Sequence, residues 1–157
     1  MALTLETVRH PSSRRGVTGH ARTTVVFDAT HGPVGNFIIF PLVGRVWLQF
    51  FTCWCTADLA GATATIGVGE AAGDTDAILP ITTATVVDTG EWFFETSGTA
   101  ADIATPTQSL VGGASVSQIN KMVGSDITVT IGTADITGGT LIFDAVYFPL
   151  TDTGRLN

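Results

Sequence analysis

The chain has 157 residues, of which 45% are hydrophobic and only 13% are charged, and its formal net charge is −7 at pH 7. This length is that of a single domain with its own core, and an acidic, charge-poor chain lacks the Lys and Arg with which nucleic-acid-binding proteins neutralise phosphates. We therefore expect one domain that binds no nucleic acid and hides part of its charge-poor surface in an oligomer.

The basic residues are concentrated at the N-terminus. Four of the seven lie in the first 22 residues: Arg9, Arg14, Arg15 and Arg22. One acid, Glu6, opposes them, whereas from Val46 onward only two basic residues oppose twelve carboxylates, 2 − 12 = −10. The start also lacks the basic and apolar regions of a secretory signal. We predict that residues 1–22 form an extended arm whose arginines bind an acidic partner surface, and that residues 23–157 form the domain.

The body is rich in Thr and Gly, a composition typical of strands joined by tight turns. In chain order, the segments with strand character are 23–29, 35–40, 43–56, 62–68, 77–87, 91–96, 119–123, 126–132 and 140–150. Pro80 places the fifth of these at a sheet edge or divides it, and residues 97–117 form the longest expected loop. Because no segment has a helical period beyond one turn, we predict an all-β domain of about eight to ten strands.

Residues 43–56 form the most apolar of these segments. Its even positions make an apolar face, namely Val46, Leu48, Phe50 and Trp54, while the odd positions are mixed. The segment is long enough to bend or bulge near Gln49. One face suits a core and the other a subunit contact, so we predict that Trp47 and Phe51 belong to an oligomer interface.

The 19 residues from Phe37 to Cys55 also have the length of a membrane span. They include Pro41, Gly44, Arg45 and Gln49, however, and their aromatic residues are central rather than at the two ends. Two consecutive buried strands explain the run better, and no membrane partner is expected.

Cys53-Trp54-Cys55 resembles half of a zinc site, because residues i and i+2 of a strand share a face. No second Cys pair follows, and the remaining ligands would have to come from His10, His20 or His31. A disulfide between i and i+2 would be strained. We predict two reduced, packed thiols and no metal.

The acidic residues also have structural explanations. Asp74 and Asp76 have the spacing of a calcium loop, but the glutamate that such a loop needs at its twelfth position is Thr85, so we predict an ordinary turn with capping carboxylates. Asp144 lies within an apolar strand, where an unpaired carboxylate is costly. It should pair with a base such as Arg45 or Arg155, or face solvent at a sheet edge.

No enzyme motif is present. The sequence has no G-x-S-x-G, no P-loop and no G-x-G-x-x-G. We therefore predict neither catalytic residues nor a cofactor. The three tryptophans, Trp47, Trp54 and Trp92, are suited to stacking on sugars, but on apolar strands they are more often core or interface residues.

Two stretches, GVGEAAGDTDAILPITTATVVDTGEWF (67–93) and DITVTIGTADITGGTLIFDAVYFPLTDTG (126–154), resemble small virion proteins of tailed bacteriophages, of the capsid-decoration or head-fibre type. The resemblance implies a β-sandwich or jelly roll of antiparallel strands without enzymatic activity. It also implies a homo-oligomer, most often a trimer, that binds the major capsid protein on the outside of the head. A carbohydrate- or receptor-binding module of a phage tail or fibre is the alternative.

Overall fold

The computed structural model describes residues 18–28, 31–90, 92–94, 102–104 and 121–157. These residues contain twelve β-strands and one 3-10 turn, η1 (Ala84–Val86), and none of them lies in an α-helix. Every strand pair is antiparallel. The predicted all-β class is confirmed.

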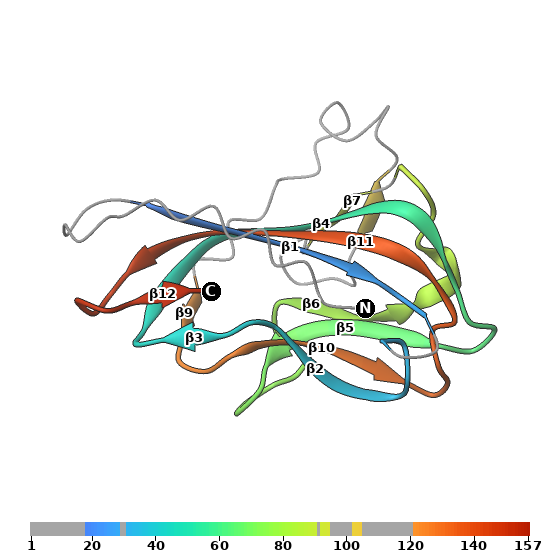
Figure 1. Ribbon diagram of the computed structural model, residues 1–157, viewed down its shortest axis with the longest axis horizontal. Coiled ribbons are helices and arrows are strands. Elements are labelled where there is room, and N and C mark those ends of the chain that lie inside the picture. Colours follow the sequence, from blue (N-terminus) through green and yellow to red (C-terminus); the bar gives the residue numbers. More distant parts are fainter. Residues whose placement is uncertain (1–17, 29–30, 91, 95–101, 105–120) are drawn as a thin grey trace.

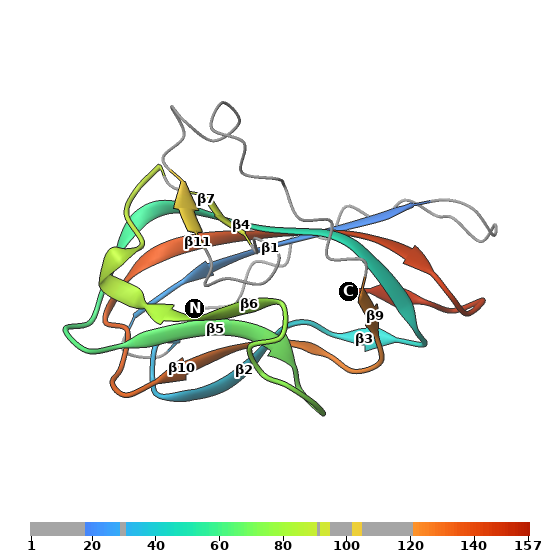
Figure 2. The same ribbon diagram turned by 180° about the vertical axis from the view of Figure 1, so that it is seen from behind.

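The strands form two main sheets that lie face to face as a sandwich (Figure 1). The larger sheet has the order β1 (Gly19–Val26), β11 (Gly138–Pro149), β4 (Val46–Ala60), β7 (Trp92–Phe94) and β8 (Asp102–Ala104), and β9 (Lys121–Val123) also pairs with β4. The smaller sheet has the order β2 (Gly35–Phe40), β10 (Ile127–Gly132), β5 (Thr65–Glu70) and β6 (Leu79–Thr83). At one end of the sandwich, β3 (Leu42–Val43) pairs with β12 (Arg155–Leu156). Figure 2, seen from behind, shows the C-terminus at the same end as β3.

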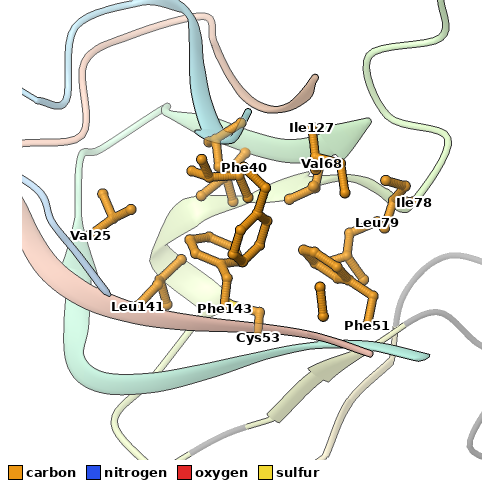
Figure 3. Packing of buried hydrophobic residues seen from close by; sticks show 14 of the residues in the cluster. Val25, Phe40, Phe51, Cys53, Val68, Ile78, Leu79, Ile127, Leu141 and Phe143 are labelled. Atoms are coloured by element: carbon orange, nitrogen blue, oxygen red, sulfur yellow. The ribbon is translucent and has the colours of Figure 1, made fainter. Parts of the chain in front are cut away.

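Aromatic side chains from both sheets meet in the core (Figure 3). The ring of Phe40, on β2, lies edge-on to that of Phe51, on β4, with centroids 6.3 Å apart. Phe51 also contacts Phe143 of β11 at 6.1 Å. All three side chains are fully buried, so they join the two sheets through direct packing.

Strand β4 changes the side that it turns toward the core. Its buried apolar residues are even-numbered at first and odd-numbered later: Val46, Leu48, Phe51, Cys53, Cys55 and Leu59. Between the two stretches the pairing with β11 skips Gln49. Because one extra residue inverts the alternation of a strand, this bulge accounts for the change. The bend or bulge predicted near Gln49 is confirmed, and it is a bulge.

The bulge also corrects two predictions made from a uniform alternation. Phe50 and Trp54 do not continue the buried face of Val46 and Leu48, because they follow the extra residue and are only half-buried. Phe51, predicted at an oligomer interface, is 1% exposed and belongs to the core. In this conformation its side chain has no surface left for a second copy.

Pro80 lies in β6, the edge strand of the smaller sheet, as predicted. Proline has no N–H to donate to a neighbouring strand and is therefore tolerated at an edge. The segment predicted as 77–87 ends as a strand at Thr83 and continues into η1.

The expected boundary between arm and domain at residue 22 is corrected by β1, which begins at Gly19 and pairs with β11 along its whole length. Ala21, Thr23 and Val25 are buried, whereas His20 and Arg22 are exposed. This alternation is that of a half-buried strand, and it holds residues 19–22 in the sheet. Residues 1–17 of the expected arm lie outside the described residues.

Short strands account for the other differences. β8 lies within the stretch 97–117 that was expected to be a loop, and β3 and β12 were not predicted. Strands of two or three residues are too short to show an alternating pattern. The described residues therefore contain more strands than the eight to ten expected.

Candidate interaction surface

The outer face of the larger sheet carries the sequence-predicted site residues that the structure describes, apart from the buried Phe51. Strand pairing arranges its side chains in rows across β1, β11 and β4. One row is polar and consists of Arg22, Asp144 and Thr52. The row on one side of it consists of His20, Val146 and Phe50. The surface thus combines one charged row with apolar neighbours.

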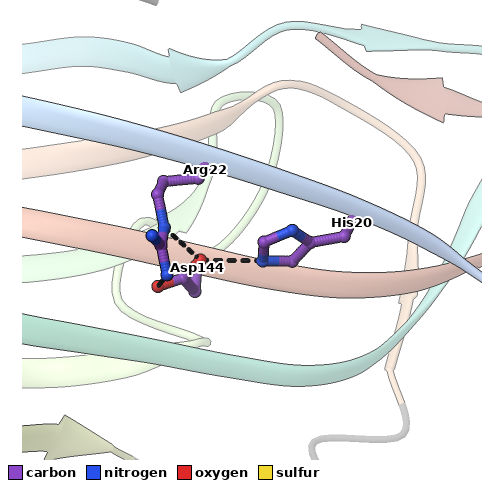
Figure 4. A network of polar contacts seen from close by, with 3 residues as sticks. All are labelled: His20, Arg22 and Asp144. Atoms are coloured by element: carbon purple, nitrogen blue, oxygen red, sulfur yellow. Dashed lines mark hydrogen bonds and ion pairs between the residues drawn. The ribbon is translucent and has the colours of Figure 1, made fainter. Parts of the chain in front are cut away.

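Asp144 is the centre of a polar cluster, formed with His20 and Arg22, that we call the Asp144 cluster (Figure 4). Arg22 donates from Nε to Oδ1 of Asp144 at 2.8 Å and from Nη2 to Oδ2 at 3.0 Å, a two-pronged contact. His20 Nε2 lies 2.8 Å from Oδ1. The Asp144 side chain is 12% exposed and that of Arg22 is 52% exposed, so the pair stabilises a carboxylate that the flanking side chains largely remove from water.

The pairing predicted for Asp144 is confirmed, but its partner was wrong. Neither Arg45 nor Arg155 reaches it; Arg22 does, because β1 is the neighbour of β11 and places residue 22 directly opposite residue 144. The sequence contains a signal for the earlier start of this strand, though not for its pairing: Ala21 and Val25 alternate with the polar Arg22 and Thr24.

A second row, which we call the Trp47 row, lies at the end of the sheet nearest to β9. Trp47 of β4 is flanked by Phe148 of β11 on one side and by Met122 of β9 on the other. Trp47 is 43% exposed and Met122 is 58% exposed, while Phe148 is half-buried. Large apolar side chains that are exposed next to one another in this way are typical of interaction sites.

The predicted partner-binding arginines are divided by the structure. Arg9, Arg14 and Arg15 lie outside the described residues. Arg22 lies on β1, and half of its side chain remains accessible to solvent beside Asp144. β1, which carries it, is the edge strand of the larger sheet.

The two cysteines are fully buried free thiols on one face of β4, as the strand spacing predicted. The Cys55 thiol donates to the carbonyl oxygen of Ala57 at 3.2 Å. Burial raises the pKa of the Cys53 thiol well above its usual range, and the neighbouring Cys55 adds to this effect. The thiol form is therefore favoured, which suits packing rather than metal ligation or nucleophilic attack.

The histidines that would have completed a zinc site are placed elsewhere. His20 contacts Asp144, and His31 contacts Asp28 through Nδ1 at 3.1 Å; His10 lies outside the described residues. Within the described residues, no group of three or more His, Cys, Asp or Glu side chains is arranged to hold a metal ion.

Several other carboxylates hold turns in place. Asp126 accepts a hydrogen bond from the Leu42 amide at 2.7 Å, and Asp135 accepts one from the Val34 amide at 2.8 Å. Asp58 accepts from both the amide and the hydroxyl of Thr89, and these bonds lower its pKa. These side chains replace missing backbone partners in loops, which is a structural role.

The Asp74–Asp76 turn behaves as its sequence predicted. Asp74 accepts a hydrogen bond from the Asp76 amide at 3.3 Å. A hydrogen bond between the two carboxyl groups raises the pKa of Asp76 and lowers that of Asp74. The turn folds back onto β5, where a side chain at Gly69 would collide with the backbone of Asp74 and Thr75. The carboxyl pair is open to solvent and lacks the burial typical of a catalytic acid pair.

The run Phe37–Cys55 forms strands β2, β3 and the first part of β4, as expected from its Pro, Gly and Arg. Among the described residues, no helix is long and apolar enough to cross a membrane.

Comparisons with known proteins give likeness of structure rather than of sequence. The sequence matches no protein-family model, and no curated protein is similar to it. The structure is similar to a chain of the acidic stable capsid structure of Helicobacter pylori bacteriophage KHP30, with a TM-score of 0.51 and 9% identity over 92% of this chain and 95% of that chain.

Two further capsid structures contain similar chains at lower scores. A chain of the cyanophage Pam1 capsid asymmetric unit gives a TM-score of 0.48 and 14% identity, over 92% of this chain and 99% of that chain. A chain of the capsid of Ralstonia phage GP4 gives a TM-score of 0.45 and 15% identity, over 91% of this chain and 90% of that chain. At 9% identity, the likeness to the chain from the KHP30 capsid establishes a shared fold.

Proposed function

We propose that this chain is a non-enzymatic structural protein of a phage virion, a decoration protein that binds the outer surface of the head as a homo-oligomer, with a trimer as the first expectation. The observation that carries the proposal is the likeness to the chain from the KHP30 capsid, which covers nearly the whole of both chains. A match of this extent compares complete domains rather than a shared motif. The resemblance of residues 67–93 and 126–154 to small virion proteins of tailed bacteriophages supports the same assignment from the sequence.

The chemistry of the described residues agrees with a structural role. The two cysteine thiols are buried, and the carboxylates of Asp58, Asp126 and Asp135 hold turns in place. Asp144 is engaged with Arg22 and His20. Side chains used in this way stabilise loops and strands, as a protein that serves as a rigid component of a shell requires.

The proposed partner is the major capsid protein, which the basic arm would contact. Arg9, Arg14 and Arg15, with the accessible half of Arg22, suit an acidic patch on that protein or on a neighbouring subunit. Each exposed ion pair contributes only about 0–1 kcal/mol and is weakened by salt. Several arginines are therefore needed, and attachment should weaken as the ionic strength rises.

A sugar-binding role on a tail or fibre is less well supported by the surface. Trp47 is accessible enough to stack on a sugar ring, but its neighbours in the row are Met122 and Phe148. Carbohydrate sites combine aromatic faces with hydrogen-bonding side chains that orient the hydroxyl groups. The Trp47 row offers only the apolar part of such a site.

Co-sedimentation of the purified protein with heads assembled from the major capsid protein of the same phage tests the proposal. We expect saturable binding that decreases with salt. Replacing Arg9, Arg14 and Arg15 together by Gln should weaken it about 5- to 30-fold, as three exposed pairs of this strength predict. The matched control is Arg45→Gln, which lies outside the arm. No binding by the unaltered protein, or no effect of the triple replacement, would contradict the respective part of the proposal.

A further inference from the structure

In the Trp47 row, two exposed apolar side chains and a half-buried one are adjacent across neighbouring strands. Trp47 lies directly opposite both Met122 and Phe148, so the row presents a continuous apolar strip across β9, β4 and β11. Another exposed apolar side chain, that of Ile81, lies on β6, the edge strand of the other sheet. Isolated exposed residues are ordinary on a protein surface, whereas a contiguous strip containing Trp and Met is not.

The charge around the row indicates what covers it. Neither the Trp47 row nor the adjacent row of His20, Val146 and Phe50 contains a carboxylate. The next carboxylate on this face, Asp144, is paired with Arg22. These two rows therefore carry no negative charge, although the chain as a whole carries −7.

A second copy of the same chain is the occupant that such a surface suits. Near a rotation axis each side chain meets its own counterpart, so a charged group would face an identical charge, while an apolar group gains contact. Two molecules that each carry −7 can approach closely only where their carboxylates are kept away from the contact. Tryptophan and methionine are also enriched at the centres of interfaces.

We propose that the Trp47 row lies at the contact between copies of this chain, close to the symmetry axis of the homo-oligomer. The inference rests on the homo-oligomer of the proposed function and adds the surface that forms it. Phe51 takes no part, because the bulge at Gln49 directs it into the core, whereas Trp47 lies before the bulge and points outward.

Light scattering of the purified protein, without any capsid component, provides the first test. The unaltered protein should have a mass that is a multiple of 16.3 kDa. The double variant Trp47→Glu, Met122→Glu should raise the dissociation constant at least about 30-fold, with an unchanged circular dichroism spectrum. The matched control is Ile81→Glu, since Ile81 is 52% exposed on the other sheet and its replacement should leave the mass unaltered. A monomeric unaltered protein, or a double variant that stays assembled, would overturn the inference.

Disulfide trapping provides a test that does not depend on weakening the protein. Met122→Cys should form a covalent dimer on mild oxidation, because position 122 would lie near its own counterpart. Ile81→Cys should not do so, and the native Cys53 and Cys55 are fully buried and will not compete. The absence of a covalent dimer from Met122→Cys under conditions where the protein is assembled would place the axis elsewhere.

These results separate the inference from the proposed function. A protein that assembles through the Trp47 row but does not bind heads retains the contact between copies and refutes the role on the capsid. A monomer that binds heads would refute the contact between copies and retain the role on the capsid.

Discussion

At the scale of single residues, the Asp144 cluster shows how a charge is tolerated in an apolar strand. Asp144 lies between Ile142 and Val146 on the outer face of β11, and Arg22 covers it from β1 with two hydrogen bonds. That Asp144 needs a base could be predicted from its apolar neighbours. Which base it finds could not, because the partner depends on the order of strands in the sheet, and 122 residues separate the two positions.

Arg22→Ala should lower the free energy of unfolding by about 1–2 kcal/mol, because it leaves a mostly buried carboxylate without its main partner. The control is Arg45→Ala, because Arg45 is exposed and does not contact Asp144. This replacement should change the free energy of unfolding by less than about 0.5 kcal/mol. Urea denaturation of both variants measures the difference. Equal effects of the two replacements would show that the Arg22–Asp144 pair does not stabilise the fold.

The turn closed by Asp58 and Thr89 predicts a dependence on pH. Hydrogen bonds from Thr89 lower the pKa of Asp58 in the folded protein, so the ionised carboxylate stabilises the fold above the unfolded pKa. This stabilisation is lost as the pH falls through the folded value. Thr89→Val should therefore lower the melting temperature at pH 7, and the difference from the unaltered protein should shrink toward pH 3. A difference that stays constant with pH would exclude Asp58 as its cause.

At the scale of elements, β4 shows which features of a strand can be predicted from its sequence pattern and which cannot. The length of residues 43–56 predicted a bend or bulge near Gln49, and Pro80 predicted a strand that lies at an edge or is divided. The consequence of the bulge for Phe51 was missed, since an alternation read straight through position 49 assigns the wrong face to every later residue. Strands as short as β8 and β12 depend on their pairing partners rather than on a pattern of their own.

The C-terminal strand β12 is a short element with a large expected effect. Leu156, within this strand, is buried, and the Asn157 amide donates to the carbonyl oxygen of Pro41 at 2.9 Å. Leu156→Ala should lower the free energy of unfolding by about 2–4 kcal/mol, through lost apolar contact and the cavity that remains.

Leu150→Ala is the matched control, because Leu150 is exposed and loses little on truncation. Denaturation by urea, followed by circular dichroism, compares the two variants. Similar small effects for both would mean that β12 does not close the end of the sandwich.

At the scale of the whole molecule, the charge distribution and the fold are the basis for proposing that copies of this chain assemble. The composition already predicted an oligomer, because 13% charged residues leave much of the surface without charge. We propose that the contact between copies lies on the outer face of the larger sheet, where the Trp47 row contains no carboxylate. The proposed location on a phage head rests on a structural comparison that composition cannot supply, since sandwiches serve many functions.

Cryo-electron microscopy of heads assembled with and without this chain tests the central claim most directly. The account predicts additional density on the outer surface, at regularly repeated symmetric positions, into which the sandwich fits with the Trp47 row turned toward the local axis. Heads that look the same with and without the chain would contradict it, and so would density for the sandwich in the tail alone.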